Sequence, residues 1–278
     1  MSVWFAILIL VVGIGAYLIA SESRFIYFPS RHYDATPEQY TLRAEPLEIS
    51  TADRVRLRGW WIHGEGKRAL LYFHGNGGNI SHRLERVRLL VDALGFDLFL
   101  VDYRGYGMSD GSPGESGLYA DGAAIYQAAR ERGFPPEQIV FFGESLGCAV
   151  AVETALSHPG RSIILEAPFL SIPAMAKAVY PFLPAFLVRT RFDNGAKVPR
   201  LTLPKLIAVP ERDDVVPPSQ GFRLYELAAS PKELYVIRGA GHNNTHIVGG
   251  VDYMEAWRKF LTNQGGSSAP SPSGRGSG

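Results

Sequence analysis

The sequence predicts an α/β fold in which a mostly parallel central sheet is flanked by helices on both faces. Short runs such as ALLYF at 69–73 and DLFLV at 97–101 are apolar at every position, as is typical of strands that are buried on both faces. Segments with helical spacing follow most of these runs, and strands that alternate with helices form parallel sheets. The carboxyl ends of such strands share one edge, where ligands bind.

The predicted strands come at regular intervals along the chain. The first alternates apolar and charged residues and is therefore half-exposed, whereas the later ones are short apolar runs that end in glycine-rich or charged loops. The predicted strands are Arg54–Ile62, Ala69–Phe73, Asp97–Val101, Gln138–Phe142, Ser162–Glu166, Leu206–Val209 and Leu234–Ile237.

Helices are predicted where apolar residues recur on one face. Leu84, Val87 and Leu90 show this spacing in the first helix, and Gly133 with the two prolines after it stops the second. The predicted helices are Asn79–Leu94, Leu118–Arg132, Cys148–His158, Gln220–Ala229 and Val251–Phe260.

Composition excludes several classes of protein. A chain of 278 residues with 46% hydrophobic residues can bury a sizeable core. Its 28 Lys and Arg against 27 Asp and Glu argue against binding nucleic acid through bulk charge. Cys148 is the only cysteine and the histidines lack metal-ligand spacing. We therefore expect no disulfide, no metal and no cofactor, and no obligate protein partner is evident.

The N-terminal segment is uncharged from residue 2 to residue 21. Twenty helical residues span about 30 Å, the hydrocarbon thickness of a bilayer. We interpret residues 1–23 as a single-pass transmembrane anchor; a cleaved signal peptide is the alternative, although early Lys or Arg and a good cleavage site are missing. Arg24, Arg31 and Arg43 follow the segment, which favours a cytoplasmic domain but leaves the side of the membrane open.

The rest of the chain divides into a folded domain at 24–264 and a tail at 265–278. The tail is rich in Gly, Ser and Pro, so we expect it to be disordered. Within the domain, an insert at about 167–204 combines prolines with many apolar residues. We interpret it as a short cap whose apolar character suits an acyl chain; a helix that simply packs on the core is the alternative.

The pentapeptide GESLG at 143–147 matches the G-x-S-x-G motif of serine nucleophiles. Ser145 stands between a predicted strand and a predicted helix, so the chain must turn sharply there, and the two glycines avoid clashes in that turn. A second match, GMSDG at 107–111, is followed by turn-forming residues instead of a helix. We therefore interpret Ser145 as the nucleophile and Ser109 as a turn residue.

A serine nucleophile needs a base and a carboxylate that orients it. His242 follows the last predicted strand and is the expected base, with His246 as the alternative. Glu211, Asp213 and Asp214 follow the penultimate strand, and the order serine, acid, histidine fits this kind of site. Spacing alone does not rank these adjacent carboxylates.

Several of these motifs together resemble the α/β-hydrolase superfamily, and most closely its serine aminopeptidase-like and lysophospholipase-like branch, in which small, often membrane-anchored acyl hydrolases are found. They are HGNGGN at 74–79, DYRGYGMSDG at 102–111, GESLG at 143–147, RDDVVP at 212–217 and GAGH at 239–242. The resemblance covers residues 45–262. It implies the α/β-hydrolase fold, and it selects Asp213 as the acidic residue, with Asp214 as the alternative.

An oxyanion hole is expected beside the nucleophile. One donor is the backbone amide of Leu146, the residue after Ser145. The resemblance favours the amide of Asn76 as the second, with Gly77 as the alternative, and Gly75 and Gly77 are expected to contact the substrate. The segment 102–107 is expected to brace these loops through an Asp102–Arg104 pair.

These observations predict a serine hydrolase that cleaves carboxylic ester or thioester bonds through Ser145, His242 and Asp213, with an acyl-enzyme intermediate. The apolar cap and the N-terminal segment favour a lipid-like substrate with an acyl chain. The alternatives are a peptidase or amidase, or an acyltransferase, since the same triad serves these reactions. A membrane scaffold without activity is a further alternative.

Overall fold

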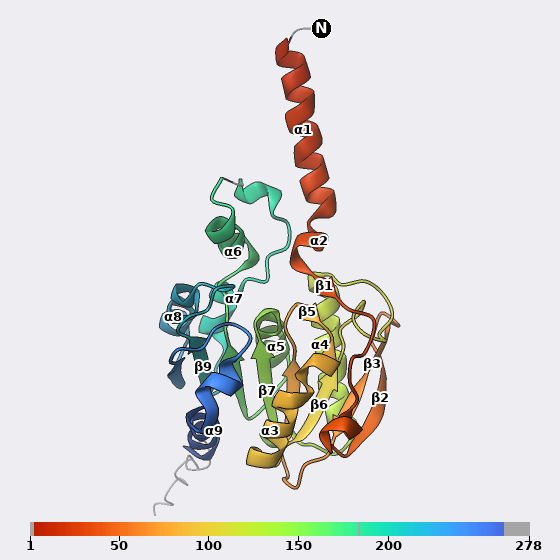
Figure 1. The fold of residues 1–278 in the computed structure, drawn as a ribbon, viewed down its shortest axis with the longest axis vertical. Helices are drawn as coiled ribbons and strands as arrows, with labels where there is room; N and C mark the ends of the chain where they lie inside the picture. The colour runs from red at the N-terminus through yellow and green to blue at the C-terminus, as the bar shows by residue number, and fades with distance from the viewer. Residues whose placement is uncertain (1–2, 183, 264–278) are drawn as a thin grey trace, which may run out of the picture.

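Eight strands form the central sheet of the computed structural model, which describes residues 3–182 and 184–263 (Figure 1). Their order is β10-β9-β8-β7-β4-β6-β3-β2. β2 pairs antiparallel with β3, and β3 with β6, while the other neighbours are parallel. The predicted α/β fold with a mostly parallel sheet is thereby confirmed. The predicted tail at 265–278 lies outside the described residues.

The strand bounds agree closely with the apolar runs. β4, β6 and β8 have the predicted limits, and β7 and β9 are each buried along their whole length. The strands are β2 (Ala44–Ser50), β3 (Arg56–Ile62), β4 (Ala69–Phe73), β6 (Asp97–Val101), β7 (Ile139–Glu144), β8 (Ser162–Glu166), β9 (Lys205–Pro210) and β10 (Lys232–Ile237). β2 was not predicted; it forms one edge of the sheet.

Helices cover both faces of the sheet (Figure 1). Val87 of α3 and Trp257 of α9 belong to the buried cluster on one face, and Ile125 of α4, Val150 of α5 and Leu224 of α8 belong to the cluster on the other. The helices are α3 (Leu84–Leu94), α4 (Glu115–Glu131), α5 (Leu146–Ser157), α8 (Pro218–Leu227) and α9 (Thr245–Asn263). Short 3₁₀ turns are η1 (Pro37–Tyr40), η2 (Ile80–Arg83) and η3 (Pro136–Gln138).

The N-terminal segment forms helix α1 (Val3–Ser21), which projects away from the sheet (Figure 1). A membrane-spanning helix is predicted there from the sequence, but no helix in the described part of the chain has the length and apolar character needed to cross a membrane. A short helix α2 (Ser23–Ile26) and strand β1 (Phe28–Pro29) follow. β1 pairs with β5 (Gly77–Gly78), within the loop after β4.

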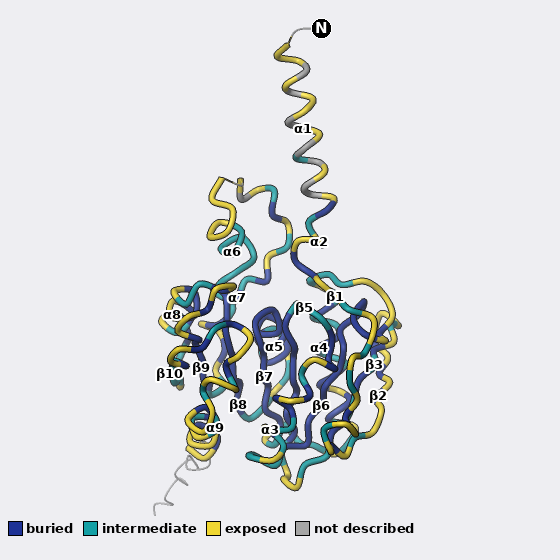
Figure 2. The backbone as a smooth tube through the Cα atoms, viewed as in Figure 1, coloured by how far each residue is buried: buried dark blue, intermediate teal, exposed yellow. Residues whose placement is uncertain are grey.

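The insert between β8 and β9 contains α6 (Ile172–Val179), η4 (Ala185–Leu187), α7 (Asn194–Lys197) and η5 (Val198–Arg200). α6 has no buried residue; Figure 2 shows it partly buried at its start and exposed at its end, projecting beyond the edge of the buried sheet. Ile172 and Met175 nevertheless pack against the edge of the core. The insert therefore begins at the carboxyl edge of the sheet and extends beyond it, next to the base of α1 (Figure 1).

Candidate active site

Ser145 occupies a sharp turn between β7 and α5. Its φ of 53° and ψ of −117° lie in a region that costs energy for a residue with a side chain. The residues two positions before and two positions after it must be glycine, because other backbone atoms of the domain lie too close for a side chain. A Cβ on Gly143 would be 2.6 Å from the Cα of Cys148, and one on Gly147 would be 1.9 Å from the carbonyl oxygen of Phe73. The strained strand–turn–helix expected for GESLG is present.

The loops after β9 and β10 bring an acid and a base to this turn. His242 Nε2 lies 3.1 Å from Ser145 Oγ, and His242 Nδ1 lies 2.8 Å from Asp213 Oδ2. Because a carboxylate only accepts, Nδ1 carries the proton and the lone pair of Nε2 faces the serine hydroxyl. The amides of Val215 and Val216 donate to the other oxygen of Asp213 at 2.9 and 2.8 Å, which fixes the carboxylate.

The alternative residues lie elsewhere. Asp214 is exposed, and Glu211 accepts a hydrogen bond from the amide of Gly239. His246 accepts hydrogen bonds from Arg86, and burial and this guanidinium lower its pKa to about 4. Ser109 is fully buried; its hydroxyl donates to a backbone carbonyl and accepts from a backbone amide. The structure thus brings Ser145, His242 and Asp213 together, and none of these alternatives.

The loop after β4 lies beside the turn. Asn76 uses its carbonyl oxygen and its side chain to fix the loop: the oxygen accepts from Phe28 N and Tyr106 Oη, and Nδ2 donates to Ile26 O. The amide of Leu146 begins α5 and has no helical acceptor.

The two glycines assigned to substrate contact lie on either side of Asn76. A Cβ on Gly75 would lie 3.6 Å from the carbonyl oxygen of Glu144, so this glycine is next to the serine turn. A Cβ on Gly77 would have no other atom within 4 Å, and the Gly77 carbonyl oxygen accepts a hydrogen bond from Arg83.

The segment 102–107 braces this loop, although the expected Asp102–Arg104 pair is wrong. Tyr103 Oη donates to the carbonyl oxygen of His74 at 3.0 Å. Asp102 accepts hydrogen bonds from Ile80 N and Tyr33 Oη. Arg104 instead forms ion pairs with two other carboxylates, those of Asp53 and Asp121.

A buried ionic network lies beneath the site and was not predicted from the sequence. Glu166, at the end of β8, accepts hydrogen bonds from Arg86, Thr245 and Tyr253 at 2.7, 2.7 and 2.6 Å. Its backbone oxygen accepts from Ser145 N at 2.9 Å. Glu166 therefore joins the serine turn to the start of α9, three residues after His242.

Glu144, the residue before the nucleophile, belongs to the same network. Its burial disfavours the charge, but Arg83 and Arg86 outweigh this and hold its pKa at about 2. A cavity of about 280 Å³ lies beside it, with His82, Arg83 and His246 in its lining. Within the described residues, no cluster of His, Cys, Asp or Glu side chains is arranged to hold a metal ion.

Known proteins resemble this chain in sequence. A family model described as serine aminopeptidase, S33, matches residues 64–198. An uncharacterized protein of Mycobacterium tuberculosis is 35% identical over 257 residues, which cover 90% of each chain. The alpha/beta hydrolase domain-containing protein WAV2 of Arabidopsis thaliana is 32% identical over 282 residues, which cover 91% of each chain.

Solved structures resemble the fold. An esterase of Pyrococcus furiosus, Pf2001, superposes with a TM-score of 0.72 at 21% sequence identity, over 87% of this chain and 98% of the esterase. At this identity the likeness concerns the fold, and it extends over nearly the whole of the esterase.

Proposed function

The chain belongs to the α/β-hydrolase superfamily, and from this premise we propose that it is a serine hydrolase of carboxylic ester or thioester bonds. One observation carries the proposal: Ser145, in its strained turn, contacts His242 Nε2 at 3.1 Å, while His242 Nδ1 contacts Asp213 at 2.8 Å. Nucleophile, base and orienting acid thus form one connected series of hydrogen-bonding contacts, as attack on an acyl carbonyl requires.

The reaction follows from this geometry. Ser145 Oγ attacks the carbonyl carbon while its proton moves to His242 Nε2, and Asp213 stabilises the imidazolium that forms. The amides of Leu146 and Asn76 hold the oxyanion, a contribution of about 3–4 kcal/mol per donor. His242 then protonates the leaving group. Water, deprotonated by His242, attacks the acyl-serine, and the acid is released with Ser145 restored.

An ester with an acyl chain is the proposed substrate class. The cap begins at the carboxyl end of β8, one residue after Glu166, and carries exposed apolar side chains such as Tyr180 and Phe186. An apolar segment that begins on the strand next to the one leading to Ser145 suits an alkyl chain. Attachment to a membrane through residues 2–21 is part of this proposal and rests on the sequence, which has no charge over that stretch.

Hydrolysis of amides is the second candidate, because the matching family model is named for serine aminopeptidases. The same triad would cleave a peptide bond. Turnover of p-nitrophenyl esters of short and long chain, set beside aminoacyl p-nitroanilides, separates the two. A preference for acetyl over every longer ester would contradict the acyl-chain assignment.

Fluorophosphonate labelling tests the chemistry itself. Wild type, Ser145→Ala, His242→Ala and Ser109→Ala are compared, and the last is a matched control because Ser109 occupies the other G-x-S-x-G match. We expect labelling and ester turnover to disappear in Ser145→Ala and His242→Ala and to persist in Ser109→Ala. Failure of the wild type to label would refute the proposal and favour a scaffold without activity.

A further inference from the structure

We propose that the tip of the cap and helix α1 form one lipid-facing surface, and that the cap tip inserts into the headgroup region of a bilayer that contains anionic lipids. The cap tip is defined here as Val179, Tyr180, Phe182 and Phe186. This inference rests on the proposed attachment through residues 2–21 and adds a second contact, made by the catalytic domain itself.

The cap tip exposes aromatic side chains that nothing in the described chain covers. Phe182 is 97% exposed and Phe186 is 81% exposed, and Val179 and Tyr180 are each more than half exposed. They lie on α6 and η4 and on the segment between them, and the two elements contact each other. Aromatic side chains gathered at one projecting end of a protein are typical of a surface that meets another apolar phase.

The cap tip lies alongside α1. η4 contacts α1, and a Cβ on Gly15 would be 3.8 Å from the side chain of Leu187. Gly15 is six residues before the end of the helix at Ser21, or about 9 Å along its axis. If the surface of the bilayer lies at the C-terminal end of α1 and the rest of the helix lies inside, the cap residues next to Gly15 are immersed to a depth of about 9 Å. Apolar faces at membrane interfaces sit about 5–10 Å deep.

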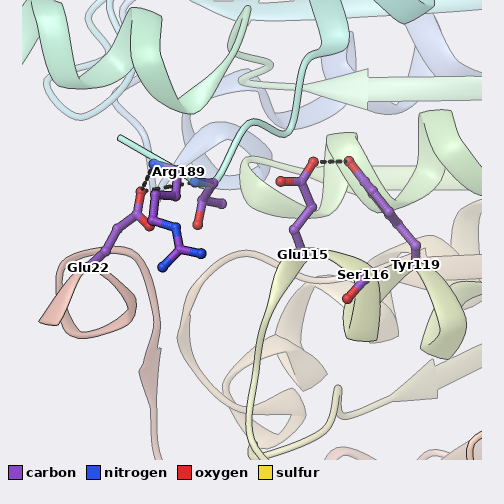
Figure 3. Close-up of a pocket in the computed structure, with 6 residues that line it drawn as sticks. Glu22, Glu115, Ser116, Tyr119 and Arg189 are labelled. Carbon is purple, nitrogen blue, oxygen red and sulfur yellow. Dashed lines mark hydrogen bonds between the residues drawn. The ribbon is translucent and has the colours of Figure 1, made fainter. Parts of the chain in front are cut away.

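Two glutamates hold the segment that returns from the cap, one at the base of α1 and one at the start of α4; Figure 3 shows the first of these contacts. Glu22, directly after α1, accepts hydrogen bonds from the amides of Arg189 and Thr190 at 2.8 and 3.0 Å. Glu115, at the start of α4, accepts from the next two amides, at 2.7 and 2.8 Å. An open groove of about 520 Å³ lies between these carboxylates. Four consecutive amides are thus held, two by the residue after α1 and two by α4, so the cap is tied both to α1 and to the core of the domain.

The charges around this surface select anionic lipids as its partner. Arg24, Lys177, Arg189 and Arg191 are all exposed, and they lie on α2, on α6 and on the segment that returns from the cap tip. Glu22 and Glu115 are occupied by backbone amides. Cations next to exposed aromatic side chains match a bilayer surface, where anionic headgroups border the acyl region.

Site-specific fluorescence tests this surface on the full-length chain. Cys148 is fully buried, so an engineered cysteine at an exposed position is the one that a thiol-reactive, polarity-sensitive dye labels. Phe182→Cys reports on the cap tip and Tyr17→Cys on α1. Val251→Cys is the matched control, because Val251 is an apolar residue that is 83% exposed but lies on α9, which belongs neither to the cap nor to α1.

Each labelled variant is mixed with vesicles of phosphatidylcholine, with or without phosphatidylserine, and with spin-labelled lipids as quenchers. We expect blue-shifted, quenched emission at positions 182 and 17 and unchanged emission at 251. Arg189→Gln combined with Arg191→Gln removes two positive charges, so the extra quenching at position 182 that phosphatidylserine causes should fall by at least twofold. The cap should stay in place, because the bonds to Glu22 and Glu115 are made by backbone amides that both substitutions keep.

The outcomes separate the proposals. Quenching at position 17 without quenching at 182 would leave the attachment standing and overturn the cap surface, and quenching at neither would overturn both. A blue shift at 182 without vesicles that grows with protein concentration would show that a second copy covers the tip, which also overturns the inference. Fluorophosphonate labelling of Ser145 in each variant reports folding and activity independently of any lipid contact.

Discussion

Substituting Arg86→Met should destabilise the domain strongly, because Arg86 is the cation that neutralises a buried carboxylate. The Arg86 side chain is 4% exposed and that of Glu166 is 0% exposed, and Nη1 lies 2.7 Å from Oε1. Arg86 also donates to Thr245 at 2.8 Å. Removing one partner of such a pair leaves an uncompensated charge and costs about 3–5 kcal/mol, a large part of the roughly 5–15 kcal/mol by which a domain is stable.

Denaturant unfolding, followed by tryptophan fluorescence, measures this cost. Arg223→Met is the matched control: Arg223 pairs with Glu226 at 2.7 Å, but both side chains are more than half exposed, and such pairs contribute about 0–1 kcal/mol. Combining Arg86→Met with Glu166→Gln removes the charge that was left behind, so we expect it to recover at least half of the loss. A cost for Arg86→Met no larger than that of Arg223→Met would refute the reasoning.

The same change should slow the chemistry in molecules that remain folded. Glu166 holds the amide of Ser145 through its backbone oxygen and holds Thr245, close to His242, through its carboxylate. Losing Arg86 loosens both connections at once. We therefore expect slower fluorophosphonate labelling at denaturant concentrations where the variant is still folded, while Arg223→Met labels at the wild-type rate.

Three further predictions follow from single residues. Asp213→Asn should lower turnover by about 10⁴-fold through loss of the correct imidazole tautomer, while Asp214→Asn should leave ester turnover near wild type; equal losses would contradict the assignment. Burial raises the pKa of Asp102 to about 7. Between pH ~4 and ~7 the folded state therefore holds a proton that the unfolded state releases, so stability should fall as pH rises through this range. Asp102→Asn should flatten that slope in urea unfolding measured at several pH values, and an unchanged slope would exclude Asp102 as its source. Gly147→Ala would place a Cβ 1.9 Å from a backbone oxygen of β4, whereas one on Gly77 meets nothing within 4 Å. We expect Gly147→Ala to abolish folding or fluorophosphonate labelling and Gly77→Ala to leave both intact. Normal labelling of Gly147→Ala would show that the turn has room for a side chain.

Signals that are local in sequence predicted most strands of the sheet and placed Ser145 and His242 at its carboxyl edge, whereas Asp213 was selected only through the family resemblance. Runs such as 69–73 and 97–101 are buried on both faces, so composition alone reveals them. β2 escaped because it is an edge strand: AEPLEIS mixes two glutamates and a proline with few apolar residues, and prolines and charges are tolerated where one side of a strand is unpaired.

Long-range ionic contacts could not be predicted in this way. Arg86 lies on an amphipathic helix, where arginine normally faces solvent, and its partner Glu166 is 80 residues away. Asp102 and Arg104 are close in sequence, yet each bonds to distant groups, Asp102 to Tyr33 and Arg104 to Asp121. The spacing of residues along the chain does not show which distant segments the fold brings into contact. The ionic network around Glu166 was therefore found only in the three-dimensional structure.

The segment that connects α1 to the sheet links the position of the helix to the chemistry. At the end of α2 and two residues beyond it, Ile26 and Phe28 bond to Asn76, the residue whose amide is assigned to the oxyanion. Directly before α2, Glu22 binds the backbone amides of the segment that returns from the cap. One stretch of seven residues, from Glu22 to Phe28, therefore positions an oxyanion donor with one end and the cap with the other. The base of α1 is thus connected by short hydrogen-bonded links both to the proposed oxyanion loop and to the cap.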